Sequence, residues 1–162
     1  MAITKQKKSE ILAKVTSAID SAKSVVFVNF HNLTVAEERE LRSKLRAEGV
    51  GYTVAKKTLI RKALEGKGIE GTFPELPGEI AIAYSTEEIA PAREVAAFAK
   101  THEGHLALAG GIFGGVFMDK AQIAVVAAIP GMQTLRAQFV QLINSPLQRF
   151  AVVLNAKAEK AA

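Results

Sequence analysis

Short β-branched and aromatic runs alternate with helical patterns along most of this sequence, and this alternation limits the fold more than any other feature. The runs "SVVFVNF" (24–30), "GYTVAK" (51–56) and "IAIAYS" (80–85) are rich in strand-forming residues and too short to be buried helices. Strands that alternate with helices are typical of α/β proteins. We therefore expect a compact α/β sandwich with flanking helices, and a mixed sheet rather than a purely parallel one.

The segments between these strands predict amphipathic helices. In residues 4–23 apolar side chains recur at helical spacing. Thr34 and Glu37 have the spacing of a capping box, and the helix that they open should end at Gly49. Thr58 is expected to cap the helix that follows the second strand.

Three further elements complete the expected sandwich. A helix over about 88–101 accommodates Pro91 in its first turn. The segment 105–117 predicts a strand and a turn, with a hairpin as one possibility, and the glycines of 110–115 suit that turn. Asp119 should then cap a short helix.

The chain changes character after Pro130, where a helical pattern runs to the end with no strand candidate. Pro146 should kink or break this helix. The hexapeptide "FVQLIN" (139–144) recurs eleven residues later as "FAVVLN" (150–155). Eleven residues make about three helical turns, so both copies present the same face. Such a face needs a partner, either by folding back on the sandwich or by binding another chain.

Positive charge is concentrated in the first third of the chain. Residues 1–62 hold 13 Lys or Arg against 6 Asp or Glu, whereas residues 63–162 hold 8 against 10. The stretch "VAKKTLIRKAL" (54–64) places four cations around a strand-to-helix junction. An anionic partner would relieve their mutual repulsion, although a solvated basic surface would have the same composition.

Few residues suggest catalysis, a cofactor or a metal. The chain has no Cys, which excludes thiolate chemistry and disulfides. His102 and His105 form an H-x-x-H pair, but Glu103 points elsewhere on a helix and no third ligand is evident. The glycines of 110–115 lack the pattern of a phosphate-binding loop. We expect no enzyme, no cofactor, no metal and no small-molecule substrate.

The same composition argues against a membrane protein. No apolar run approaches the length of a membrane span, and the first twenty residues lack the apolar core of a signal peptide. The polar face of the terminal helix is also poor in Lys and Arg, unlike that of a membrane-surface helix. No membrane partner is expected, and the expected localisation is cytoplasmic.

An anion-binding site is the chemistry that the residues favour. Thr58 and the N–H groups at its helix start can hold a phosphate, with Lys56 and Lys57 just before and Arg61 one turn along. The loop at His31 and Asn32 also follows a strand, so it could open at the same end of the sheet. Exposed aromatic side chains are too few for a single-strand stacking platform, so a folded RNA fits better.

Four segments in order resemble the bacterial large-subunit ribosomal protein ten family. They are "NFHNLTVAEERELRSKLRAEGVGYTVAKKTLIRKAL" (29–64), "LPGEIAIAYS" (76–85), "LALAGGIFGG" (106–115) and "AAIPGMQTL" (127–135). The resemblance covers essentially the whole chain. It implies a ribosome-bound protein with an N-terminal α/β domain (1–130) that binds 23S rRNA at the GTPase-associated centre, beside ribosomal protein eleven. It also implies a mobile C-terminal helical segment (131–162) that carries dimers of the acidic stalk protein (L-seven/L-twelve), which recruit translational GTPases.

The resemblance can be carried over to particular residues. By position, the RNA-facing set is Lys8, His31, Asn32, Lys56, Lys57 and Thr58, to which the charge pattern adds Arg61. The chain departs from the family pattern in two places. Lys57 stands where the family usually has Asn, and His31-Asn32 stands where it usually has Arg-Gly. A base contact by that Asn is therefore not expected here.

The repeat in the tail gains an interpretation from the same resemblance. Each copy would present its apolar residues to one stalk dimer, and these residues are Phe139, Leu142, Ile143, Phe150, Val153 and Leu154. Two copies predict two dimers, because no third copy of the pattern occurs. The alternative functions are a small α/β nucleotide-binding module or enzyme, and a protein-interaction adaptor with an incidental basic face.

Overall fold

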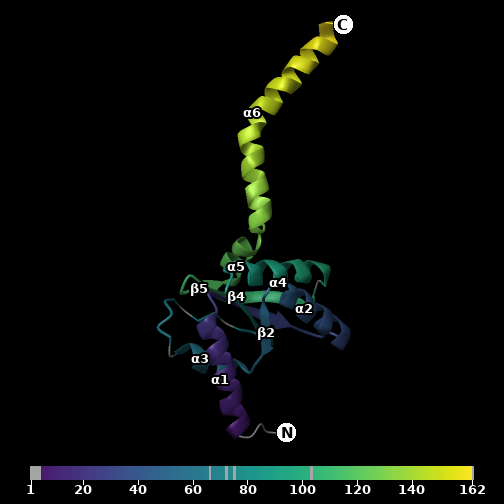
Figure 1. Cartoon of the computed structure of the whole chain (residues 1–162). Helices are drawn as coiled ribbons and strands as arrows, with labels where there is room; N and C mark the ends of the chain where they lie inside the picture. Colours follow the sequence, from purple (N-terminus) through teal and green to yellow (C-terminus); the bar gives the residue numbers. More distant parts are fainter. Residues whose placement is uncertain (1–4, 66, 72, 75, 103, 162) are drawn as a thin grey trace. The chain divides into compact units, whose positions relative to one another are not determined.

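The computed structural model describes residues 5–65, 67–71, 73–74, 76–102 and 104–161. The chain divides into two units, 1–129 and 130–162. Figure 1 shows the order of the elements. Those of the first unit are α1 (Lys5–Ser21), β1 (Ser24–Phe30), α2 (Val35–Ala47), β2 (Gly51–Val54), α3 (Lys57–Glu65), β3 (Glu79–Ser85), α4 (Ala90–Thr101), β4 (Leu106–Phe113), β5 (Val116–Asp119) and α5 (Lys120–Ala127).

The five strands form one sheet in the order β2-β3-β1-β4-β5. All four pairings between these strands are antiparallel, so the expectation of a mixed sheet is wrong. The helix that follows β1 does lead to a strand parallel to β1, as the alternating pattern suggests. However, β3 lies between β1 and β2 and runs opposite to both. The units β1-α2-β2 and β3-α4-β4 are therefore split βαβ units, in which parallel strands are not neighbours.

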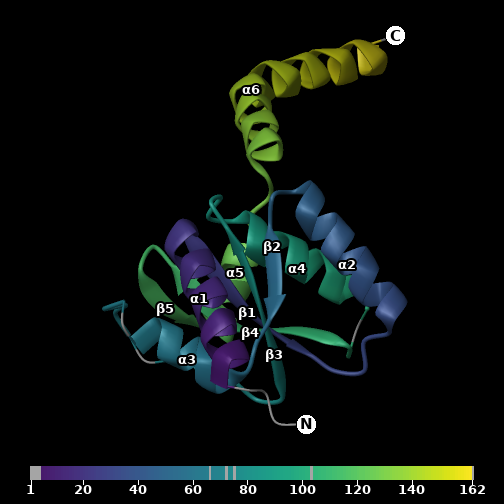
Figure 2. The ribbon, with the colours of Figure 1, turned by 60° about the horizontal axis from the view of Figure 1, so that its bottom comes forward.

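Helices cover both faces of the sheet, and this three-layer arrangement confirms the predicted α/β class with flanking helices (Figure 2). Because successive strand residues point to opposite faces, β1 contributes to two cores. Val25 and Phe27 pack with residues of α1 and α3, whereas Val26 and Val28 pack with residues of α2, α4 and α5. This double burial explains why the strand sequences are continuously apolar.

The predicted hairpin is present as β4 and β5. Its two-residue turn is Gly114-Gly115, and both residues have positive φ angles, 59° and 80°. A two-residue turn of this kind matches the twist of the flanking strands, and glycine adopts it without steric cost. Gly111 in β4 serves a different purpose. A Cβ atom there would lie 2.7 Å from the Val25 carbonyl oxygen and 2.8 Å from Cδ1 of Ile123, so glycine allows α5 to approach the sheet.

Two helix boundaries test the capping predictions. The capping box of Thr34 and Glu37 is confirmed at the start of α2, and Gly49 follows the helix end with a φ of 68°. The prediction that Thr58 caps α3 is wrong. Strand β2 ends at Val54, earlier than expected, and the helix begins at Lys57. The carbonyl oxygen of Lys56 accepts the first hydrogen bond of the helix, from the Ile60 N–H at 3.1 Å.

The second unit is a single helix, α6 (Met132–Ala161), of 30 residues. Pro146 lies at its middle and kinks the helix without breaking it, as the bend of α6 in Figures 1 and 2 shows. Proline cannot donate a hydrogen bond to the carbonyl four residues earlier, that of Leu142. The hydroxyl of Ser145 donates to that oxygen instead, at 3.0 Å.

Among the described residues no single helix is long and apolar enough to cross a membrane, although α5 and α6 taken together as a bent pair meet the criteria of length and composition.

Candidate nucleic-acid interface

The strand register brings the predicted loops to one end of the sheet. Phe30, the last residue of β1, pairs with Glu79 at the start of β3 and with Leu106 at the start of β4. Val54, the last residue of β2, pairs with Ala81 near the same start of β3. The loop after β1 and the junction after β2 therefore open at the same end, which confirms the expected juxtaposition. We call this end of the first unit the basic end.

At the junction after β2, helix α3 turns its cations outward. Ile60, Ala63 and Leu64 are buried against the sheet and α1, whereas Lys57 and Arg61 of the same helix are exposed. Lys56 and Thr58 are exposed as well. A hollow of about 370 Å³ lies here, lined by Lys57, Thr58 and Arg61 of α3 and by Phe73, Pro74 and Leu76 of the loop before β3. The hollow combines two cations, a hydroxyl group and an aromatic ring.

The cations around the start of α3 differ in their intramolecular partners. The guanidinium Nε of Arg61 lies 3.2 Å from Oε1 of Glu65, one turn along the helix. In the part of the chain that the structure describes, no ion pair involves Lys56 or Lys57. These two lysines are therefore the more available charges, since Arg61 must exchange a carboxylate for any external anion. Both groups of the Arg61 pair are well exposed, so the exchange costs little.

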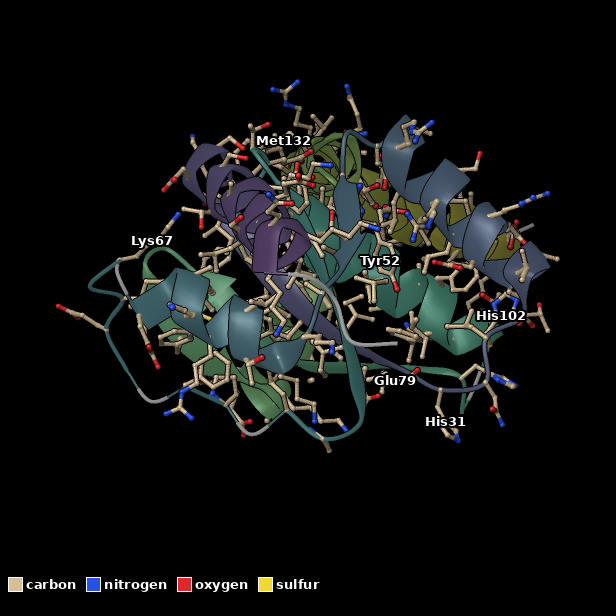
Figure 3. The ribbon with its side chains drawn as sticks, turned by 90° about the horizontal axis from the view of Figure 1, so that it is seen from below. His31, Tyr52, Lys67, Glu79, His102 and Met132 are labelled. Carbon is tan, nitrogen blue, oxygen red and sulfur yellow. The ribbon has the colours of Figure 1, made fainter. Side chains whose placement is uncertain are left out.

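The loop after β1 presents His31 and Asn32 as exposed side chains. Figure 3 shows His31 pointing outward. Asn32 has a φ of 51°, in the left-handed region that Gly and Asn tolerate best. This conformation explains how Asn can occupy position 32, where the family that the sequence resembles usually has Gly. A hollow of about 500 Å³ adjoins the loop, and it is lined by residues that include Asn32, Tyr52, Val54 and Glu79.

Sequence reasoning missed the contact between this loop and His105, the residue just before β4. The His31 N–H donates to the His105 carbonyl oxygen at 2.8 Å. Nδ1 of His105 lies 3.3 Å from the His31 carbonyl oxygen and 3.2 Å from that of Asn32. No local pattern could have revealed these contacts, because the partners are backbone atoms from a distant part of the sequence. Sequence reasoning also missed Glu79, a carboxylate at the basic end.

The capping box of α2 holds the other side of the same loop. The Thr34 N–H donates to Oε2 of Glu37 at 2.8 Å, and the Glu37 N–H donates to the Thr34 hydroxyl at 3.3 Å. The backbone hydrogen bond from Thr34 lowers the pKa of Glu37 below its ordinary 4.5, and the side-chain hydrogen bond from Thr34 and the charges of His102 and His105 lower it further. The hydrogen bonds at the start of α2 therefore favour the charged form of the Glu37 carboxylate.

Lys8 reaches the same end from α1. Helix α1 finishes next to the start of β1, packs against α3 and has about the length of the strand, so its first turns lie where β1 ends. Figures 1 and 2 both show the first turns of α1 beside α3. Lys8 is exposed there. All seven predicted RNA-binding residues therefore belong to the elements and loops of the basic end.

The histidine pair that suggested a metal has other contacts. The ring of His102 stacks on Phe98 with centroids 4.2 Å apart, and His105 contacts backbone carbonyls. Glu103, the residue between them, lies outside the described residues. Within the ranges that the structure describes, no group of three or more potential ligands could hold a metal ion.

Exposed lysines and an exposed helix start, beside a loop held by backbone hydrogen bonds, are typical of surfaces that bind the phosphate backbone of a folded nucleic acid. The chain can also be compared with known proteins. Residues 3–100 match the family model described as "Ribosomal protein L10". The chain is 36% identical over 160 residues to the large ribosomal subunit protein uL10 of Variovorax paradoxus, covering 99% of this chain and 90% of that protein.

Relatives from a second group of bacteria agree. The proteins of the same name from Staphylococcus epidermidis and Staphylococcus carnosus are 37% and 35% identical, and the matches cover 98% and 94% of this chain and 95% and 92% of those proteins. The chain belongs to the ribosomal protein L10 family. This is a family of structural proteins of the large ribosomal subunit and not of enzymes.

Replacement of Glu37 by Gln tests the electrostatic role of the capping box. A carboxyl group with a lowered pKa in the folded state stabilises the fold above its ordinary value of 4.5. That stabilisation disappears as the pH falls through the lowered pKa. The difference in free energy of unfolding between the unsubstituted chain and Glu37→Gln should therefore be largest above pH 4.5 and should shrink below it, as measured by urea denaturation across pH. Glu10→Gln, an exposed change on α1, is the control, and a difference that stays constant with pH would contradict this role.

Proposed function

We propose that this chain is a scaffold of the large ribosomal subunit whose first unit binds 23S rRNA at the GTPase-associated centre, beside ribosomal protein eleven. One observation carries the proposal. The antiparallel register places the exposed loop after β1 and the cationic start of α3 at one end of the sheet, although they are distant in sequence. The family gives the ribosomal context.

The chemistry of the basic end suits a folded RNA. Lys8, Lys56 and Lys57 are point charges on flexible stems, so they can follow phosphates of a curved backbone. Arg61 can contact two phosphate oxygens at once after releasing Glu65. His31 and Asn32 lie on a fixed loop, where they can hydrogen-bond to an unpaired base or a ribose hydroxyl. Recognition would thus combine electrostatic attraction with a fixed shape.

For the second unit, we propose that α6 anchors dimers of the acidic stalk protein, which recruit translational GTPases. The six apolar residues of the repeat are between 51% and 69% exposed (Phe139, Leu142, Ile143, Phe150, Val153 and Leu154). The two phenylalanines lie about three turns apart, on the same face. An amphipathic helix of this kind binds in a hydrophobic groove of a partner. The protein would act in the cytoplasm, bound to the ribosome.

The salt dependence of RNA binding tests the basic end. If Lys8, Lys56, Lys57 and Arg61 each neutralise one phosphate, the slope of log Kobs against log salt should be about −3 to −4. Replacing Lys57 with Ala should flatten the slope by about one unit. The measurement is a binding titration with an rRNA fragment of the GTPase-associated centre at several salt concentrations.

Lys23→Ala is the matched control for Lys57→Ala. Lys23 is also an exposed lysine, but it precedes β1 and lies at the opposite end of the sheet. Lys23→Ala should leave the salt slope unchanged. A slope that does not change in Lys57→Ala would show that Lys57 lies outside the interface. If the variant that lacks the charges of Lys56, Lys57 and Arg61 has the same slope as the unsubstituted chain, the result would favour an adaptor with an incidental basic surface.

The number of stalk dimers tests the repeat. Native mass spectrometry of the chain with the acidic stalk protein should give two dimers per chain. Replacing both Phe150 and Leu154 with Ala removes the anchors of the second copy, so one dimer should remain. Gln148→Ala, an exposed polar change between the two copies, should leave both. A complex with three dimers would contradict the count.

A further inference from the structure

The ring of His105 is placed between two backbone carbonyl groups of the loop after β1. Nδ1 lies 3.3 Å from the His31 oxygen and 3.2 Å from the Asn32 oxygen. Carbonyl oxygens only accept hydrogen bonds, so Nδ1 must carry the proton and donate to both. The backbone of His105 adds a third contact, because its oxygen accepts from the His31 N–H at 2.8 Å. His105, the residue just before β4, therefore fixes three successive peptide groups of the loop, 30–31, 31–32 and 32–33.

These contacts act on a segment that would otherwise be adaptable. Asn32 has a φ of 51°, a conformation that a non-glycine residue adopts as one of several and not as its preferred state. Two residues further on, the capping box of Thr34 and Glu37 fixes the start of α2. The backbone is thus held on both sides, while the side chains of His31 and Asn32 remain exposed. Held backbone and free side chains are what a preorganised contact surface requires.

We propose that His105 is a positioning residue for RNA binding, which holds the His31-Asn32 loop in its binding conformation without contacting the RNA itself. This inference rests on the proposed function of the basic end. If the loop is binding-competent only part of the time, the apparent dissociation constant rises in inverse proportion to that fraction. His105 keeps the fraction close to one. Because it neutralises no phosphate, its loss should weaken binding equally at every salt concentration.

Two substitutions separate positioning from simple packing. His105→Ala removes the donor, whereas His105→Asn places an amide N–H close to the position of Nδ1. His102→Ala is the control, since His102 is a neighbouring imidazole that stacks on Phe98 and not on the loop. The measurements are binding titrations with the same rRNA fragment across salt and NMR order parameters of the amides of residues 31–33 in the free chain.

His105→Ala should raise the dissociation constant about three- to tenfold, the equivalent of one or two ordinary hydrogen bonds, with an unchanged salt slope. The order parameters of residues 31–33 should fall from about 0.85 toward 0.6. His105→Asn should bring the affinity back to within about twofold, and His102→Ala should change neither quantity.

Three results would overturn the proposal. They are an unchanged affinity in His105→Ala, an unchanged loop order in that variant, or a salt slope that flattens with the loss of His105, which would place its ring on a phosphate. Failure of the proposed function is distinguishable from these. In that case the unsubstituted chain itself would not bind the rRNA fragment, while the order parameters would still decide whether His105 holds the loop.

Discussion

The insertion of β3 between β1 and β2 is the constraint on which the rest of this structure depends. The pairings of β3 with β1 and β2 are both antiparallel, and together with the antiparallel pairing of β1 and β4 they place the ends of β1 and β2 beside the starts of β3 and β4. His105 therefore meets residues that precede it by 74 and 73 positions. The same register gathers the cationic start of α3 and the first turns of α1 at one end of the sheet. The candidate interface is a consequence of strand order, because no single segment of the chain contains it.

Local signals predicted much of the fold. The strand over 24–30, the capping box of Thr34 and Glu37, and the two-glycine hairpin are encoded by residues close in sequence. Strand order is different, since pairing energy depends on contacts between distant segments and alternating strands and helices are compatible with several orders. The misplaced cap at Thr58 has a similar origin, because the end of β2 is set by its pairing with β3 and not by its own residues. The role of His105 could not be predicted either, since its partners are backbone oxygens that carry no side-chain signature.

The two units present their proposed binding surfaces in different ways. In α3, burial of Ile60, Ala63 and Leu64 turns the cations outward, so the packing that forms the core also exposes the positive charges. In α6, Pro146 lies between the two copies of the apolar repeat, and Ser145 satisfies the carbonyl that proline leaves without a donor. The helix can therefore change direction between the two proposed binding segments without losing its continuity. A folded unit for RNA and a helix for protein partners fit the scaffold role that we propose within the ribosomal protein L10 family.

The most direct test of the account is to map, by NMR chemical-shift perturbation, where the isotope-labelled chain contacts the rRNA fragment of the GTPase-associated centre. The account predicts that the largest shifts lie at one end of the sheet, in residues 31–34, in residues 56–61 and in the first turns of α1. Residues at the opposite end, around Lys23 and Ser85, should not shift. Shifts concentrated at that opposite end, or along α2 and α4, would show that strand order does not build the interface and would contradict the central claim.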